Sequence, residues 1–225
     1  MNVEYLSDFI HVNKKTPFFA IYCKLFCYSF ILFIMSKYLI VGLGNIGLEY
    51  ENTRHNIGFN VASAFVHKHE GTFKPGRFAD MAEIKWKGKI FIVIKPTTFM
   101  NLSGRAFSFW LQKEKIKLEN SLTIVDDLAL PLSKLRLRSR GTDAGHNGLK
   151  DIQFYLNSDA YPKLRFGIGN KFPKGRQVDF VLSHWLPEEM PIIEKKIETC
   201  VSVIEDFAFS GIDTTMNWVN KLDFS

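Results

Sequence analysis

The pattern of apolar positions from residue 36 onward predicts alternating strands and helices. Short apolar runs rich in β-branched residues are typical of strands, and apolar side chains recurring every three or four positions give a helix one apolar face. The chain therefore predicts an α/β fold. The predicted strands cover residues 38–41, 81–86, 89–95, 122–125, 134–138 and 164–168. The predicted helices cover residues 56–66, 103–113, 148–156, a stretch beyond residue 187 that reaches residue 207, and 214–219.

Three local patterns refine this prediction. The dipeptide Lys87-Gly88 separates two strand-like runs, which is the signature of a two-residue hairpin. The apolar run at 122–125 is typical of a buried parallel strand, whereas residues 134–138 alternate cations with leucines, as a half-exposed strand does. We expect a single α/β domain over residues 35–225, with a mixed, mostly parallel central sheet and helices on both faces.

Residues 1–34 form a separate N-terminal extension. Residues 17–34 are apolar apart from Lys24 and a few weakly polar residues. An over-extended reading frame or dispensable tail, a membrane-directed segment and an accessory element are all open interpretations. The sequence Met35-Ser36-Lys37 resembles a natural start, and no small-x-small cleavage site follows the apolar run.

Composition and charge narrow the choice of partner. Of the 225 residues, 46% are hydrophobic and 23% are charged, which is the balance of an ordinary globular protein. The formal net charge of +6 favours a phosphate-bearing partner. Three cysteines give neither a disulfide framework nor a spaced metal set, so we expect a reducing, cytoplasmic environment and no metal site.

The segment from Gly42 to Gly47 matches Gly-x-Gly-x-x-Gly, the fingerprint of dinucleotide binding. That function needs a helix to begin within the motif and an acid about 20 positions later, at the end of the next strand. Residues 48–55 lack a helical apolar face, and Glu70 is the one acid at a suitable distance, at the end of a helix. Dinucleotide binding is therefore a minor alternative, and the glycines could serve only a tight turn.

Polar residues at several predicted strand ends form a second pattern. Asn45, Asn101 and Asp126 follow three strands, and Asn147 lies at a predicted helix start. Each alone could be a cap or turn residue. Because carboxyl ends of strands surround one crevice in such sheets, we expect these side chains to meet near His55 and form a polar site.

Six ordered segments give the chain a family resemblance that covers about residues 37–219. In their order and separations they resemble bacterial-type peptidyl-tRNA hydrolases, which cleave the ester between a peptide and tRNA. The resemblance implies a monomeric, metal-free α/β enzyme without a cofactor, whose partner is peptidyl-tRNA released prematurely from ribosomes. The segments are residues 41–45, 53–58, 95–104, 126–128, 145–149 and 165–169.

The resemblance also implies roles for individual residues. His55 is the expected catalytic base, and Asp126 is its partner. A neutral imidazole can take a proton from water, and a carboxylate on its other nitrogen fixes the tautomer. The sequence contains no recognisable nucleophile elbow, so we expect direct attack by water. The residues matching the family's substrate-binding positions are Asn45, Tyr50, Met100, Asn101 and Asn147.

Arg138 and Arg165 match a basic pair that clamps the terminal phosphate of tRNA in the family. An arginine fork pairs bidentately with phosphate, and such contacts serve many tRNAs because they read no bases. A solvated basic strand is the simpler alternative for this segment. A non-catalytic RNA-binding relative of the same fold also remains open, and the intact His55 and Asp126 favour the enzyme.

Overall fold

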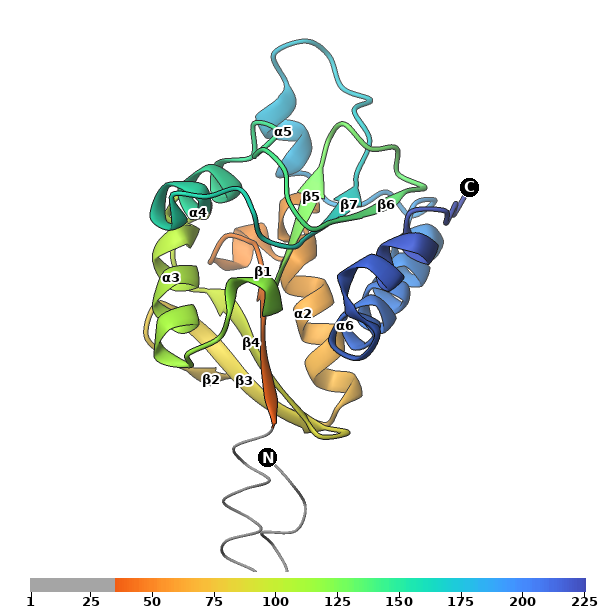
Figure 1. Ribbon diagram of the computed structural model, residues 1–225. Helices are drawn as coiled ribbons and strands as arrows, with labels where there is room; N and C mark the ends of the chain where they lie inside the picture. The colour runs from red at the N-terminus through yellow and green to blue at the C-terminus, as the bar shows by residue number, and fades with distance from the viewer. Residues whose placement is uncertain (1–34) are drawn as a thin grey trace, which may run out of the picture. The chain divides into compact units, whose positions relative to one another are not determined.

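The computed structural model describes residues 35–225, whose strands form one mixed sheet (Figure 1). The strand order is β2-β3-β4-β1-β5-β7-β6. At the centre β1, β5 and β7 pair in parallel, and antiparallel pairs lie toward both edges. The predicted mixed α/β sheet is confirmed. The strands are β1 (Ser36–Gly42), β2 (Lys74–Pro75), β3 (Ala79–Trp86), β4 (Lys89–Pro96), β5 (Ser121–Asp127), β6 (Leu135–Arg138) and β7 (Lys163–Gly167).

The local patterns explain the place of each strand. β5 is buried over its whole length between two parallel neighbours. In β6, at the edge of the sheet, buried leucines alternate with exposed arginines. Lys87 and Gly88 both have positive φ, at 43° and 75°, and connect β3 to β4 as the predicted two-residue hairpin.

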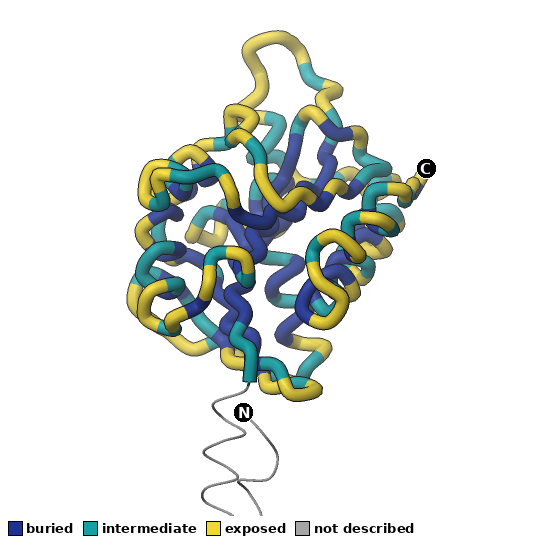
Figure 2. Tube along the Cα trace, viewed as in Figure 1, coloured by how far each residue is buried: buried dark blue, intermediate teal, exposed yellow. Residues whose placement is uncertain are grey.

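Helices cover both faces of the sheet. In Figure 1, α3 and α4 lie together on one side, and α2 and α6 lie together on the other. Figure 2 shows the buried chain concentrated in the strands between these two layers. The helices are α2 (Ile57–Lys68), α3 (Ser103–Lys113), α4 (Asn147–Leu156), α5 (Gln177–Val181) and α6 (Met190–Val219). Short 3-10 turns are η2 (Leu48–Tyr50), η3 (Arg54–Asn56), η4 (Met100–Leu102) and η5 (Leu118–Asn120).

The C-terminal part of the chain follows the prediction except for one short helix, α5. The two helices expected beyond residue 187 are both present within α6, where a kink at Gly211, with φ of 78° and ψ of 168°, separates them. Helix α5 was not predicted. It is five residues long and has no buried residue, so it carries no apolar periodicity for a sequence pattern to reveal.

Gly42, at the end of β1, and Gly58, near the start of α2, allow these two elements to pack closely. A Cβ on Gly42 would clash with the carbonyl of Gly58, and one on Gly58 would clash with the backbone of Leu43. This approach holds the start of α2 against the end of β1. The first α-helix after the motif begins at Ile57, beyond η2 and η3, so no helix N-terminus lies within the motif to hold a pyrophosphate. The arrangement removes the physical basis of the dinucleotide alternative.

Residues 37–225 form one compact unit. Within residues 35–225, no helix combines the length and the apolar character that crossing a membrane requires. The predicted N-terminal extension and its apolar stretch lie outside the described residues.

Candidate active site

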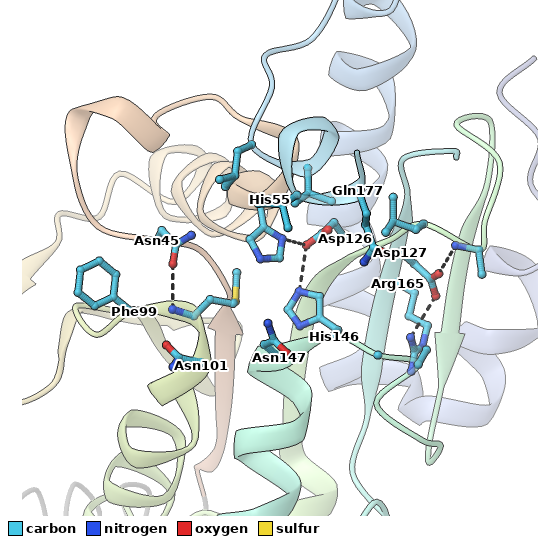
Figure 3. A pocket seen from close by; sticks show the side chains of 18 residues that line it. Asn45, His55, Phe99, Asn101, Asp126, Asp127, His146, Asn147, Arg165 and Gln177 are labelled. Atoms are coloured by element: carbon cyan, nitrogen blue, oxygen red, sulfur yellow. Dashed lines mark hydrogen bonds and ion pairs between the residues drawn. The ribbon is translucent and has the colours of Figure 1, made fainter. Parts of the chain in front are cut away.

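A cleft of about 570 Å³ opens at the carboxyl ends of the central strands. Its walls come from the ends of β1 and β5, the turn η4, the start of α4, and α5 (Figure 3). Polar side chains gather at its floor, and apolar side chains of α5 line one wall. The predicted site residues that line the cleft are Asn45, His55, Met100, Asn101, Asp126, Asn147 and Arg165.

The centre of the site is a histidine paired with an aspartate. His55 lies in η3, and its Nδ1 is 2.9 Å from Oδ1 of Asp126, near the end of β5. The His55 side chain is 14% exposed and that of Asp126 is 3% exposed. The two residues predicted as base and partner are therefore in direct contact, with the imidazole at the edge of the cleft.

A second imidazole, that of His146, binds the same carboxylate oxygen. Its Nε2 is 3.1 Å from Asp126 Oδ1, and its Nδ1 accepts the backbone N–H groups of Gly148 and Leu149 at the start of α4. Because Nδ1 is an acceptor, the proton of neutral His146 sits on Nε2 and is donated to Asp126. His146 has no role among the residues predicted from the sequence. Its place directly before a helix start, where a side-chain acceptor is expected, is the signal that could have found it.

The contacts between these side chains shift the pKa values of Asp126 and His55. Burial raises the pKa of the Asp126 carboxyl, but the two imidazoles and their hydrogen bonds lower it more, to well below its usual range. Burial lowers the pKa of His55, but the charge and hydrogen bond of Asp126 raise it, and the net value lies above the ordinary 6.5. Asp126 is thus an ionised acceptor that holds the proton of His55 on Nδ1. The Nε2 lone pair of His55 remains available to a water molecule.

The predicted asparagines meet around the cleft, as Figure 3 shows. Asn45 is fixed by Asn56, whose side chain bonds both the N–H and the carbonyl of Asn45 at 2.8 and 2.9 Å. Its Oδ1 accepts the backbone N–H of Met100 at 2.9 Å, which leaves its amide NH2 free to donate. Asn56 is a supporting residue that sequence reasoning missed.

Neither of the other two asparagines caps a helix. His146 caps α4, and the residue before α3 makes no side-chain cap. Asn101 and Asn147 are instead exposed residues that line the cleft. The simpler interpretation of these residues as caps is therefore wrong.

Two predicted wall residues have different environments. Met100 lines the cleft and is 5% exposed, and its sulfur packs near Gly148. Tyr50 lies in η2, is half-buried, and is not among the residues that line the cleft. The structure therefore brings Met100 to the site but not Tyr50.

The two arginines predicted to bind phosphate also have different surroundings. Arg165 lies in the middle of β7 and lines the cleft, but it donates to Asp127 Oδ2 at 3.0 Å and to the carbonyl of Thr142 at 2.6 Å. Arg138 is exposed at the end of β6, outside the cleft lining. Cross-strand pairing places Arg136 opposite Arg165 on one face of the sheet edge. This face is basic, as predicted, but Arg165 already has a carboxylate partner.

His55, Asp126 and His146 offer three atoms close enough together to hold a metal ion. Metal binding needs an unprotonated histidine nitrogen directed at the ion. The lone pair of His146 instead accepts the N–H groups at the start of α4, and its Nε2 carries the proton. A metal ion at these atoms would therefore require the α4 cap to break, so the hydrogen bonds do not fit a resident metal.

Comparison with known proteins agrees with this geometry. A family model described as Peptidyl-tRNA hydrolase matches residues 39–225. The chain is 54% identical over 185 residues to a peptidyl-tRNA hydrolase of Bacteroides fragilis, covering 82% of this chain and 99% of that one. A relative from Methylacidiphilum infernorum is 42% identical and covers 80% of this chain and 96% of its own.

A solved structure has the same fold. The crystal structure of peptidyl-tRNA hydrolase from Acinetobacter baumannii matches with a TM-score of 0.79 and 30% sequence identity, over 85% of this chain and 98% of that chain. The range that the family model matches includes every residue that lines the cleft. The chain belongs to the peptidyl-tRNA hydrolase family.

Proposed function

We propose that this chain hydrolyses the ester bond of peptidyl-tRNA, the activity of its family, with His55 as the general base. The observation that carries the assignment is the 2.9 Å contact between His55 Nδ1 and Asp126 Oδ1. It holds the proton on Nδ1 and leaves Nε2 to take a proton from water. The carboxylate also stabilises the imidazolium that forms in the transition state.

The reaction proceeds by direct attack of water on the ester carbonyl. His55 Nε2 removes one proton from the water as its oxygen bonds to the carbonyl carbon, and the carbonyl oxygen becomes negatively charged. The amide groups of Asn101 and Asn147 can donate to that oxygen, and Asn45 can hold the peptide. The bond to the ribose oxygen then breaks, and the imidazolium returns its proton to that oxygen. The products are a peptide acid and tRNA with a free hydroxyl.

The composition of the cleft supports attack by water. Among the described residues that line it there is no serine, threonine or cysteine to form an acyl-enzyme. All the side chains named in the mechanism belong to one chain, so we propose a monomeric enzyme that needs no metal. Because its substrate is made by ribosomes, we place the reaction in the cytoplasm.

The basic edge of the sheet is the proposed contact for the tRNA phosphates. Arg136 and Arg138 are exposed and lie on the same face as Arg165. Contacts of this kind bind tRNA through charge and do not depend on its base sequence. Arg165 would bind a phosphate while it remains paired with Asp127, and the exposed Arg138, whose side chain donates to the carbonyl of Leu137 at 3.4 Å, would bind a second.

The test measures release of an N-blocked amino acid from tRNA by the full chain. We expect His55→Ala to lower kcat by about 10²–10⁴-fold, the usual contribution of a general base. Binding of tRNA should stay within about twofold of the parent, because an uncharged wall residue adds little to a phosphate-driven interaction. His67→Ala is the matched control, since His67 is an exposed histidine on α2. Retained turnover in His55→Ala would remove His55 from the mechanism, and an inactive parent that still binds tRNA would favour the RNA-binding alternative.

A further inference from the structure

Arg54 directly precedes His55 in η3, yet its side chain is directed away from the cleft and is buried, at 3% exposed. Its guanidinium donates to both carboxylate oxygens of Glu189, at 2.7 and 3.1 Å. Its Nε donates to Oγ of Ser183 at 3.2 Å. All these partners lie in the segment that follows α5. One side chain thus joins the turn that carries His55 to the chain that leaves the cleft wall.

Two aromatic rings also lie against the same guanidinium. The centre of the Arg54 guanidinium lies 4.6 Å from the ring centroid of Phe180, in α5, and 4.6 Å from that of Trp185. Arginine is suited to this position because its plane stacks on rings while its edge donates in a fixed fork. Backbone contacts add to the connection, since the N–H of Arg54 donates to the carbonyl of Ser183.

Helix α5 is anchored to the core by the partly buried side chains of Phe180 and Val181, and Phe180 is also a ring partner of Arg54. None of its residues is buried, and Val178 is 65% exposed. The element that it contacts most among the described residues is η3, the turn of Arg54 and His55. Nevertheless, α5 contributes Gln177, Val178 and Val181 to the wall of the cleft. The position of this wall therefore depends on the contacts of Arg54 together with the packing of Phe180 and Val181 against the core.

We propose that Arg54 is a positioning residue that fixes the α5 wall of the cleft and the orientation of His55 relative to each other. This inference rests on the proposed function, because it concerns where the substrate is held against the base. A buried ion pair is a costly way to gain stability, and apolar residues often replace such pairs without loss. The directional fork of Arg54 instead defines one arrangement of the wall and the base. A displacement of about 1 Å between reacting groups can lower a rate by about 10²-fold.

The decisive experiment compares Arg54→Lys and Arg54→Ala with the parent full chain, far below the unfolding temperature of each. Arg54→Lys keeps the charge but loses the fork and the stacked plane, and we expect its kcat/KM to fall by about 10-fold or more. In Arg54→Ala we expect a fall of about 10²-fold. Free guanidinium ions, below the concentration that unfolds the parent, should restore part of this loss, whereas equal potassium chloride should not.

The control variant is Val203→Ala, which removes buried methyl groups from α6, a helix that contributes no residue to the lining of the cleft. It should lower the unfolding temperature without changing kcat or KM, and guanidinium should not affect its rate. If both Arg54 variants lose stability but keep the kcat and KM of the parent, Arg54 only stabilises the fold and the proposal is wrong. Failure of the proposed function is distinguishable, because the parent itself would then release no amino acid.

Discussion

Replacing Asp126 by asparagine removes one charge from the site and keeps its shape. The asparagine oxygen can still accept from His55 and His146, so both imidazoles retain an acceptor. The contact to be changed is 2.9 Å long, between side chains that are 14% and 3% exposed. At this degree of burial, an effective dielectric constant of about 20 gives about 4 kcal/mol for unit charges about 4 Å apart. That free energy corresponds to a loss of about 10³-fold in kcat.

The same variant should change the pH dependence in a defined direction. His55 must be unprotonated to act as a base, so kcat/KM falls as pH decreases through its pKa. In the parent that pKa lies above 6.5, because Asp126 outweighs the effect of burial. In Asp126→Asn the burial remains and the charge is absent, so the pKa falls below the ordinary value. The acid limb of the profile should therefore move to lower pH.

The assay is kcat/KM for release of an N-blocked amino acid from tRNA, measured from about pH 5 to 9, where the free-enzyme pKa of an essential base appears. Asp127→Asn is the matched control, because Asp127 is the adjacent carboxylate but pairs with Arg165. It should leave the acid limb of the profile where the parent has it. If the limb stays in place in Asp126→Asn as well, or kcat changes by less than about 10-fold, the carboxylate does not tune His55 and the charge argument fails.

Two further predictions concern charges at other sites. Arg138→Ala should raise KM and flatten its dependence on salt without loss of stability. Arg165→Ala should in addition lower the free energy of unfolding by about 3–5 kcal/mol, because it leaves Asp127 buried and unpaired. If urea unfolding gives the same free energy of unfolding for Arg138→Ala and Arg165→Ala, the proposed loss of the Arg165–Asp127 ion pair is contradicted. Burial lowers the pKa of Lys196 to about 7, so the unfolded chain binds more protons between about pH 7 and 10. As pH increases through that window, the free energy of unfolding of the parent should rise relative to that of Lys196→Met by up to about 1.4 kcal/mol per pH unit. If urea unfolding gives the same pH dependence for both proteins, the prediction is wrong.

The hydrophobic pattern was a good guide to the elements because burial in this fold is periodic. In β6, the alternation of leucine and arginine over four residues correctly indicated a half-exposed strand. Lys87 and Gly88 adopt the positive φ angles that a two-residue hairpin turn requires. The pattern failed at α5, which is only five residues long and has no fully buried residue: Phe180 and Val181 are partly buried against the core, and Val178 is exposed. It did anticipate the break in α6, because Gly211 lies in the gap between the two helices predicted to end at residue 207 and to begin at residue 214.

The chemistry of the site was less accessible than the fold, because its contacts are made between distant parts of the chain. His55 and Asp126 are 71 positions apart and meet only because β1 pairs with β5, which sets η3 beside the end of β5. Strand-end reasoning could gather these residues at one edge, whereas the pairing of base and acid came from the family resemblance.

Two supporting residues show why local sequence reasoning stops short of the site. His146 was visible in the sequence, but its function follows from which nitrogen accepts the N–H groups of α4, a fact of geometry alone. Arg54 was equally visible beside the predicted base, and its partners lie more than 120 positions away. Both residues act through a neighbour rather than on the substrate. The role of such a residue follows from its contacts with the groups around it in the fold, and a sequence motif does not contain that information.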